Sequence, residues 1–349
     1  EKFILAYPDF NIKLLSLHPD LTPSELKICL FLKMNFNTNE ICVLTNQKLR
    51  TVENKRYRLR KKLGLKSSDS LTNYIIANKK RYPKKIAYSC EGVSITYEDL
   101  YYKVATLSKN LKKMRLKKGD KIAIIYGNSI IYPQIFYSAA YLDLSIVPLN
   151  PSLSKGDLIN QINKLNIKIL FSWKEFLNNL DFKKLKLKKI NFFDLESSSK
   201  SYRNYFDLVK GNNKKFFLKR KNLKSNFDFL YGLTSGSTSD PKVSIWSQHV
   251  KIERGKHAKK IYNLKHTEKI IISNPMYHSI SFRLIVLPVI LGATCIILKK
   301  FTTKGWFENI QKWKVSFSIL VSDQVEMVSS QFKKQNMKKI RSLKKLVSC

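Results

Sequence analysis

The chain has 349 residues, of which 44% are hydrophobic and 12% aromatic, so it is not wholly disordered and is long enough for two or three domains. Its 65 basic and 25 acidic residues give a formal net charge of +40, but lysine is enriched along the whole chain. Such a bulk charge indicates polyanionic partners and does not by itself assign nucleic-acid binding.

The five cysteines are scattered along the chain and are never spaced as C-x-x-C. This pattern argues against a zinc site or a disulfide framework, and it predicts a reduced, cytoplasmic protein. The longest apolar run, Leu284–Leu298, is too short to span a membrane and is interrupted by Pro288 and Gly292. It predicts a buried helix that stops at the glycine, followed by a strand.

Residues 1–80 are predicted to form an all-α domain of four helices. The stretch Thr22–Glu25 (TPSE) combines a capping threonine, a proline in the first turn and a glutamate that completes a capping box, so it predicts a helix start. Further helices are expected to open near Asn37 and at Thr51, and apolar residues between 71 and 75 suggest a fourth.

A basic segment in this domain suggests DNA binding. Residues 48–66 hold nine basic side chains and one acidic side chain, Glu53. A short helix, a tight connection and a basic helix form a helix-turn-helix pattern, in which Val52 and Leu59 would pack inward while the cations face phosphates. Residues 21–65 resemble the DNA-binding domain of LuxR-type regulators, most closely at Tyr57–Leu65 (YRLRKKLGL). The pattern and the resemblance together imply that DNA is contacted by Lys48, Arg50, Thr51, Lys55, Arg56, Arg58, Arg60 and Lys62.

This segment departs from the LuxR-type pattern at three positions. Thr45 and Gln47 stand where that family usually buries aliphatic residues, and Lys48 stands where it often has a capping serine. Two alternatives stay open: a basic, solvated helix on an unrelated bundle, and the same fold without DNA binding. No base-reading residue is assigned.

Strand and helix alternate after a lysine-rich connection at residues 78–85. Residues 86–90 and 93–95 predict a hairpin, and Thr96 with Asp99 three residues on predicts a capped helix. A strand, a helix and another strand are expected at Ile122–Tyr126, Ile131–Leu142 and Ile146–Leu149. The alternation predicts an α/β fold with a parallel sheet. Residues 181–224, rich in Lys, Asn and Ser, are interpreted as a variable surface insertion with little functional content.

The stretch Tyr231–Lys242 (YGLTSGSTSDPK) is a hydroxyl-rich loop between two apolar strands. Gly236 allows backbone N–H groups to approach an anion closely, the hydroxyl groups add donors, and Lys242 adds a positive charge. The loop matches neither G-x-x-x-x-G-K-[ST] nor G-x-G-x-x-G. It predicts a polyphosphate-binding loop, with a flexible Ser/Thr-rich surface loop as the alternative.

The loop resembles the phosphate loop of the adenylate-forming (AMP-binding) superfamily, with Val243 where a glycine often follows the lysine. The resemblance covers roughly residues 82–349 and continues at ITYEDL (95–100), at VPLNP (147–151) and at PMYHS (275–279). It implies the partial amino-terminal domain of the adenylate-forming fold, with mixed sheets and flanking helices, so the expected domains are residues 1–80 and 81–349. Residues 249–262 are expected to form a helix, and His249, His257 and His266 are interpreted as surface residues in lysine-rich helix or loop.

The resemblance implies ATP-dependent activation of a carboxylic acid, with Mg²⁺ and then coenzyme A as cofactors. A carboxylate is nucleophilic without losing a proton, so no Ser/His/Asp triad is required, and positioning and neutralising phosphates is the main task. His278 would line the carboxylate and acyl pocket, although a satisfied core histidine is the alternative. The implied catalytic residues are Lys242 and His278, the implied nucleotide-binding residues are Thr234, Ser235, Gly236, Ser237, Thr238 and Lys242, and no metal ligand is assigned.

The chain begins at Glu1 and ends at Cys349 within an expected strand, so it is predicted to be a fragment that is catalytically incomplete by itself. The metal-binding glutamate, the ribose-binding aspartate and the carboxy-terminal domain of the superfamily would lie beyond it. One alternative is a transcriptional regulator whose α/β domain senses an acyl or nucleotide ligand without turnover. Another is an accidental gene fusion.

Overall fold

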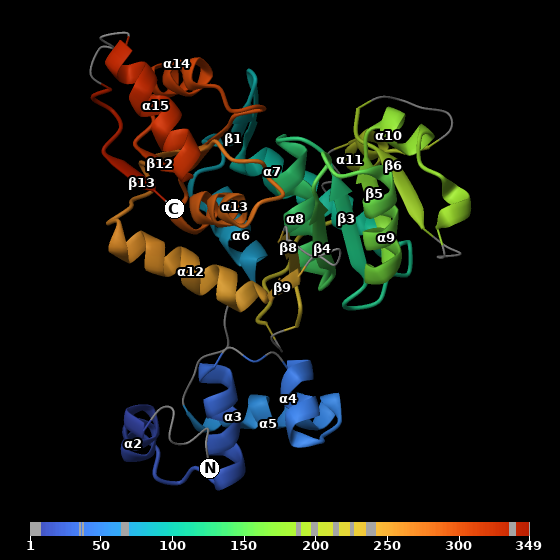
Figure 1. Ribbon diagram of the computed structural model, residues 1–349, viewed down its shortest axis with the longest axis vertical. Helices are drawn as coiled ribbons and strands as arrows, with labels where there is room; N and C mark the ends of the chain where they lie inside the picture. The colour runs from blue at the N-terminus through green and yellow to red at the C-terminus, as the bar shows by residue number, and fades with distance from the viewer. Residues whose placement is uncertain are drawn as a thin grey trace. The chain divides into compact units, whose positions relative to one another are not determined.

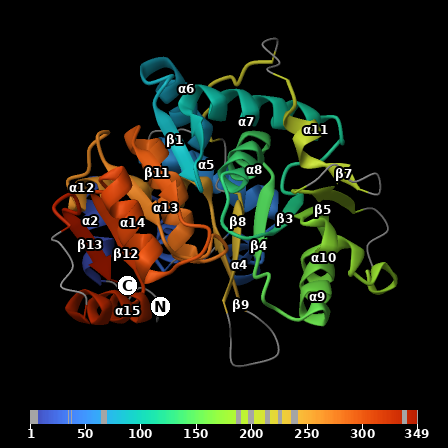
Figure 2. The ribbon, with the colours of Figure 1, turned by 90° about the horizontal axis from the view of Figure 1, so that it is seen from above.

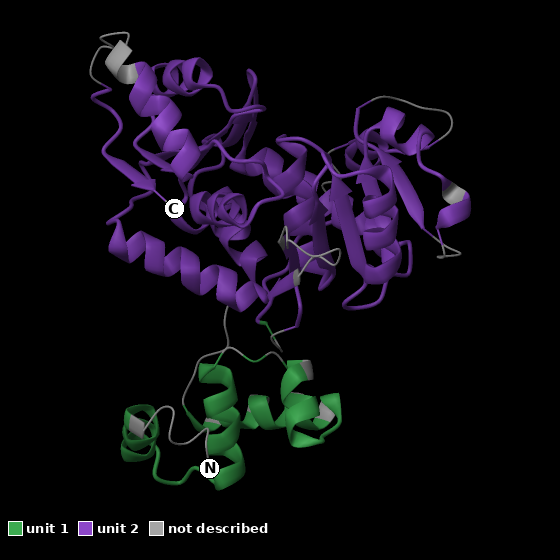
Figure 3. Ribbon diagram, in the orientation of Figure 1, with its two compact units in different colours: residues 1–68, 223–225 green, residues 69–222, 226–349 purple. Residues whose placement is uncertain are grey.

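The structure is a computed structural model that describes residues 8–34, 36, 38–63, 70–185, 190–196, 202–211, 216–223, 227–234, 242–334 and 340–348. The chain divides into two compact units. The first comprises residues 1–68 with 223–225, and the second comprises residues 69–222 with 226–349 (Figure 3).

The first unit is all-helical and contains four described helices, labelled in Figure 1: α2 (Pro8–Leu17), α3 (Pro23–Lys33), α4 (Thr38–Thr45) and α5 (Leu49–Lys62). The predicted capping box is confirmed, because the backbone N–H of Glu25 donates to the Thr22 hydroxyl at 3.3 Å and the Thr22 N–H donates to the Glu25 carboxylate at 2.9 Å. Two small apolar clusters stabilise this unit; their buried members are Leu21, Ile28, Cys29 and Leu59 in one, and Phe31, Ile41 and Val52 in the other.

The helix at residues 71–81 belongs to the second unit, so the boundary that the sequence pattern placed at residue 80 lies instead near residue 68. In this helix, α6 (Leu71–Arg81), the Asn78 amide donates to the Val289 carbonyl at 2.6 Å. The Asn73 side chain donates to the Lys221 carbonyl at 2.9 Å and accepts from the Lys221 N–H at 3.1 Å. The fourth helix of the first unit is therefore α2, which the sequence pattern did not predict.

The second unit contains two mixed β-sheets, which confirms the expected α/β class. The six-stranded sheet has the order β13-β12-β10-β11-β1-β2, and the seven-stranded sheet has the order β7-β6-β5-β3-β4-β8-β9. Neighbouring strands are parallel except in the hairpins β1–β2 and β8–β9. The strands of the first sheet are β1 (Ile86–Cys90), β2 (Val93–Thr96), β10 (Lys269–Ile272), β11 (Thr294–Ile297), β12 (Phe317–Leu320) and β13 (Lys345–Ser348). Those of the second are β3 (Lys121–Ile125), β4 (Ser145–Leu149), β5 (Ile167–Ser172), β6 (Asn191–Asp194), β7 (Arg203–Asn204), β8 (Leu230–Thr234) and β9 (Lys242–Trp246).

Helices cover both sheets and join them. Helix α13 packs on β10 and β11, α8 packs on β4, and α6 contacts both of these helices, so α8 and α13 lie between the two sheets (Figures 1 and 2). Helices α14 and α15 flank the six-stranded sheet, and α9 and α10 flank the seven-stranded sheet (Figure 2). The bounds are α7 (Tyr97–Lys112), α8 (Ile131–Leu142), α9 (Lys155–Leu165), α10 (Lys174–Asn178), η1 (Phe182–Lys184), α11 (Tyr205–Val209), α12 (Gln248–Ile261), α13 (Ser279–Leu291), α14 (Thr303–Trp313) and α15 (Ser322–Lys334).

Local sequence signals set several element ends, of which those at Thr96 and Gly292 were predicted. Thr96 and Asp99 form a capping box at the start of α7. Asp143 follows α8 with a φ of 56°, a left-handed conformation that aspartate tolerates better than most residues, and Gly292 ends α13 with a φ of 74°.

The described residues up to 222 of the stretch 181–224, which was interpreted as a variable surface insertion, form part of the second unit's fold. Strands β6 and β7 extend the seven-stranded sheet beyond β5, with Leu170 opposite Phe192 in the register. The Asn110 amide donates to the Leu208 carbonyl at 2.8 Å, which fixes α11 on α7. The lysine-rich composition concealed these pairings because they depend on residues far away in the sequence.

Candidate active site

The predicted phosphate loop lies at the tip of the β8–β9 hairpin. The hairpin pairs Leu230 with Trp246 and ends with Thr234 opposite Lys242, which confirms the two expected strands. The side chains of Thr234 and Lys242, together with residues 235–241, lie outside the described part of the chain. The predicted nucleotide contacts of Ser235, Gly236, Ser237 and Thr238 therefore stay predictions.

A close contact between a glycine and a tryptophan shapes the base of this hairpin. A Cβ atom at Gly232 would lie 2.4 Å from the Trp246 indole ring, so only glycine leaves room for the ring in its present position. Trp246 is half-buried and lies four residues after Lys242 in β9. Strand β9 thus carries both this aromatic ring and the predicted catalytic lysine.

A buried asparagine ties the ends of three parallel strands together beside the next motif. The Asn128 amide donates to the carbonyls of Asn274 at 3.0 Å and Leu298 at 2.7 Å, and its carbonyl accepts from the Met276 N–H at 2.7 Å. These residues follow β3 of one sheet and β10 and β11 of the other. Since ligand sites in α/β sheets lie outside the carboxyl ends of the strands, this junction is a natural position for a site. Sequence analysis missed Asn128, although its position directly after a buried strand was a usable signal.

His278 stands at the start of α13, immediately after this junction. It is the residue preceding the helix, and its ring lies 4.7 Å from the Tyr277 ring, with 37° between the two planes. The residue is exposed, so the alternative of a satisfied core histidine is wrong. Neighbouring protein atoms still remove part of its hydration and lower the pKa of His278, which favours a neutral imidazole at pH 7. A neutral imidazole is both a donor and an acceptor of hydrogen bonds.

A buried lysine connects the two predicted motifs. The Lys251 ammonium of α12 lies 4.1 Å from the centre of the Trp246 ring and 5.8 Å from that of Phe282, and the residue is 4% exposed. Trp246 follows Lys242 in β9, and Phe282 lies one helical turn after His278 in α13. The two segments that the sequence assigned to one site are therefore side by side. Lys251 lies in the helix expected at residues 249–262, and its burial was not predicted from the sequence.

The electrostatic environment of Lys251 is unusual for a lysine. Burial, together with the smaller effect of the positive charges of Arg254 and Arg283, lowers the pKa of Lys251 to about 7. Among the described residues, no hydrogen bond or ion pair to a carboxylate engages Lys251, Arg254 or Arg283. The described residues also contain no group of three or more His, Cys, Asp or Glu side chains that could hold a metal ion, so the protein groups that would contact Mg²⁺ stay unassigned.

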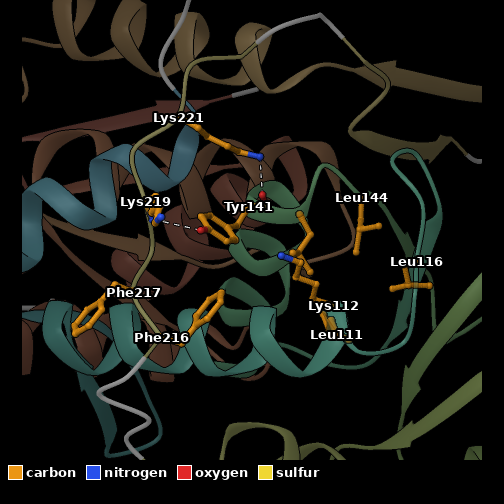
Figure 4. Close-up of a pocket in the computed structure, with 10 residues that line it drawn as sticks. Leu111, Lys112, Leu116, Tyr141, Leu144, Phe216, Phe217, Lys219 and Lys221 are labelled. Atoms are coloured by element: carbon orange, nitrogen blue, oxygen red, sulfur yellow. Dashed lines mark hydrogen bonds between the residues drawn. The ribbon is translucent and has the colours of Figure 1, made fainter.

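A separate hollow of about 640 Å³ lies between α7, α8 and residues 216–221 (Figure 4). The Lys219 N–H donates to the Tyr141 hydroxyl at 3.3 Å, and the Lys221 ammonium donates to the Tyr141 carbonyl at 2.6 Å. The hollow lies next to the amino-terminal ends of β3 and β4, at the edge of the sheet opposite to Asn128. It is therefore not part of the candidate site.

The residues predicted to contact DNA do not all point the same way in the first unit. Lys48, Thr51 and Arg58 are exposed. The Lys55 ammonium donates to the Ser24 hydroxyl at 3.2 Å, the Arg56 guanidinium donates to the Thr38 hydroxyl, and the Lys62 ammonium contacts the carboxylates of Glu25 and Asp20 at 2.9 and 3.3 Å. The hydrogen bond that the Lys62 ammonium donates to the Glu25 carboxylate is the main cause that raises the pKa of Lys62. The side chains of Arg50 and Arg60 lie outside the described residues.

The family of the second unit is settled by comparison with known proteins. The model of the family described as AMP-binding enzyme matches residues 76–349. The chain belongs to the AMP-binding enzyme family. The match begins inside α6, in agreement with the boundary near residue 68.

Curated relatives of this AMP-binding chain match its second unit at low identity. Long-chain fatty acid transport protein 6 of Homo sapiens is 24% identical over 275 residues, which are 75% of this chain and 43% of the relative. The 2-succinylbenzoate–CoA ligase of Oceanobacillus iheyensis is 26% identical over 259 residues, or 70% of this chain and 48% of the relative. The chain thus spans about half the length of the curated relatives it matches.

Solved structures share the fold. A long-chain-fatty-acid–CoA ligase from Archaeoglobus fulgidus superposes with a TM-score of 0.72 at 20% identity, covering 81% of this chain and 58% of the other. An o-succinylbenzoate coenzyme A synthetase from Bacillus subtilis, in complex with ATP and magnesium ion, superposes with a TM-score of 0.68 at 16% identity, covering 81% of this chain and 55% of the other.

None of the described helices is both long enough and apolar enough to cross a bilayer.

Proposed function

We propose that the protein containing this chain activates a carboxylic acid with ATP and transfers the acyl group to coenzyme A. One oxygen of the carboxylate forms a bond to the α-phosphorus of ATP, and the bond between that phosphorus and the bridging oxygen breaks, giving an acyl-adenylate and pyrophosphate. The thiol of coenzyme A then attacks the acyl carbon, loses its proton and releases AMP. This chain supplies the phosphate loop and part of the acid pocket.

The observation that supports this proposal is the contact of one buried lysine with both predicted motifs. Lys251 contacts Trp246 of β9 and Phe282 of α13, so the strand that follows the loop lies beside the helix that His278 precedes. The family match and the names of the relatives, among them CoA ligases, agree with this chemistry.

Each predicted residue has a role in this scheme. The backbone and hydroxyl groups of residues 234–238 bind the β- and γ-phosphates. Lys242 neutralises part of the negative charge that develops on the leaving pyrophosphate. The neutral imidazole of His278 donates a hydrogen bond to the substrate carboxylate and orients it toward the α-phosphorus. Mg²⁺, when bound, neutralises phosphate charge.

Substitution of the loop lysine tests the nucleotide part of the proposal. We expect Lys242→Ala to weaken ATP binding to the chain by about tenfold or more, as loss of a charge-assisted contact predicts, while His278→Ala leaves ATP affinity unchanged. Lys260→Met, an exposed lysine of α12, is the matched control. Isothermal titration calorimetry measures all four proteins. Wild-type affinity for ATP in the Lys242→Ala variant would refute the assignment of the loop.

The 349-residue chain alone is proposed to be catalytically incomplete, because it spans about half of its relatives. The expected result is ATP binding without full turnover in an ATP–pyrophosphate exchange assay. Turnover at a rate typical of complete enzymes, above about 1 per second, would refute this part of the proposal.

A second function, DNA binding by the first unit, is favoured by a specific observation. Val52 and Leu59 of α5 are buried as predicted, the connection between α4 and α5 is only three residues long, and Lys48 and Arg58 are exposed beside it. We propose that this unit is a LuxR-type helix-turn-helix domain that binds DNA through α5. In that case the protein is either an enzyme with an accessory DNA-binding domain or a regulator whose second unit senses an acyl or nucleotide ligand.

Salt dependence tests DNA binding. Affinity for duplex DNA is expected to fall with salt concentration, and Arg58→Ala is expected to reduce the slope of the log–log plot by about one. Lys62→Ala, which removes a lysine already paired with Glu25, is expected to change the slope less. Equal slopes for all three proteins would refute the role of α5.

We also propose a cytoplasmic location, because Cys29, Cys42, Cys90 and Cys295 are free thiols.

A further inference from the structure

We propose that Lys251 is a specificity-determining residue that binds a second anionic group of the acid substrate, so that the substrate class is acids carrying a distal anion, such as dicarboxylates. The inference rests on the proposed function, because it places the reacting carboxylate of the same molecule at His278. Nothing in the family match or in the names of the relatives assigns a role to this lysine.

The position of the ammonium places it within reach of a substrate. His278 and Phe282 are on the same face of α13, and four residues of an α-helix rise about 6 Å. The Lys251 ammonium lies 5.8 Å from the Phe282 ring centre on one side and 4.1 Å from the Trp246 ring centre on the other. In the proposed arrangement, an acid whose reacting carboxylate lies at His278 extends past Phe282, and its distal group meets this ammonium.

The local charges favour an anion at this point. Lys251 is 4% exposed, and the charged groups that act on it are Arg254 of its own helix and Arg283 of α13, both of them positive. None of these three cations has a carboxylate partner among the residues that the structure describes. Removing a charge from water without a partner is costly, so buried cations are normally paired. Lys251, the buried one of the three, has no such partner within the described part of the chain, and a bound anion would supply it.

A purely structural role explains the lysine less well. The two aromatic rings attract a cation. At a desolvated site this attraction is worth about 2 kcal/mol, which is less than the several kcal/mol that burying an unpaired charge usually costs. A methionine or leucine would fill the same space next to Trp246 and Phe282 without that cost. The position is therefore explained better by binding of an anion than by packing.

The proposal predicts how acid binding depends on pH. The pKa of Lys251 in the unliganded protein is about 7, and a bound anion raises it. The protonated lysine thus binds the distal anion most strongly below pH 7, and the preference for such acids decreases as the pH rises above 7. Binding of a diacid at pH 8 should take up protons from the buffer.

Matched pairs of linear acids test the proposal. Hexanedioate, octanedioate and decanedioate are titrated into the full chain, each against the monoacid of the same length, with Mg²⁺ and α,β-methylene-ATP present to prevent reaction. We expect at least one diacid to bind about tenfold or more tightly than its monoacid at pH 6.5, as one desolvated charge pair predicts. Lys251→Met should abolish that preference and leave monoacid affinity within about twofold of wild type. Lys251→Gln is a second variant, and Lys260→Met is the control that keeps the preference.

The possible outcomes separate this inference from the proposed function. Equal affinity for diacids and monoacids in the wild-type protein overturns the role of Lys251 and leaves carboxylate activation standing. A preference for diacids that persists in both Lys251 variants also overturns the role. Binding of the ATP analogue without binding of any acid overturns both proposals.

Discussion

The buried lysine predicts an unusual dependence of stability on pH. The pKa of Lys251 falls from its ordinary value of 10.5 to about 7 in the folded protein. Each tenfold change in an acid dissociation constant corresponds to about 1.4 kcal/mol, so protonated Lys251 costs the folded state about 5 kcal/mol below pH 7.

Lys251→Met removes this cost. Between the folded-state pKa near 7 and the unfolded-state pKa of 10.5, the unfolded wild-type chain binds more protons than the folded chain, so wild-type stability rises with pH across that window. The variant lacks this contribution. We expect it to be more stable than wild type by about 5 kcal/mol at pH 6.5 and the two proteins to converge near pH 10.

Urea denaturation followed by tryptophan fluorescence measures the effect. All four tryptophans lie between residues 173 and 313, so the signal reports the second unit. Lys260→Met, which removes an exposed lysine of the same helix, should differ from wild type by less than about 0.5 kcal/mol at every pH. A difference between Lys251→Met and wild type that stays constant from pH 6.5 to pH 9.5 would refute the reasoning about the buried charge.

Three further substitutions probe the frame of the site, all by the same fluorescence assay. Gly232→Ala forces a Cβ atom into the Trp246 ring and should lower the free energy of unfolding by about 1–3 kcal/mol. Gly127→Ala, where a Cβ atom would meet no atom within 4 Å, should lower it much less, and equal losses would contradict the contact. Asn128→Ala leaves three buried backbone groups unpaired and should cost about 3 kcal/mol, and a cost below about 0.5 kcal/mol would count against the junction. Thr96→Ala removes a helix cap and should cost about 1 kcal/mol; no change in the midpoint would argue against the cap.

Features that depend on neighbouring residues in the sequence were predictable. The capping boxes at Thr22 and Thr96, the left-handed Asp143 and the helix stop at Gly292 each follow from the chemistry of a few adjacent residues. The β8–β9 hairpin was also predictable, because both strands alternate apolar residues around one hydroxyl-rich loop.

Features that depend on distant partners were not predictable. The apolar residues of α6 predict a helix, but they do not reveal that the Asn78 amide donates a hydrogen bond to a carbonyl group 211 residues away. Lys251 is one of several lysines in α12, and its burial is created by Trp246 and Phe282, which come from two other elements. The Asn128 junction likewise requires three strands to end at one place.

The placement of α6 bears on where the chain should be cut to study the two units separately. A protein that starts at residue 81 loses α6, so the Val289 carbonyl loses the amide of Asn78, and Gln248 loses the Leu71 N–H that it accepts at 3.3 Å. Those groups are buried, and exposing them should yield an aggregating product. A protein that starts at Ser70 keeps every one of these bonds, including the contact of 3.3 Å between the Ser70 hydroxyl and Gln248. The protein that starts at Ser70 is therefore the one expected to give a well-folded second unit.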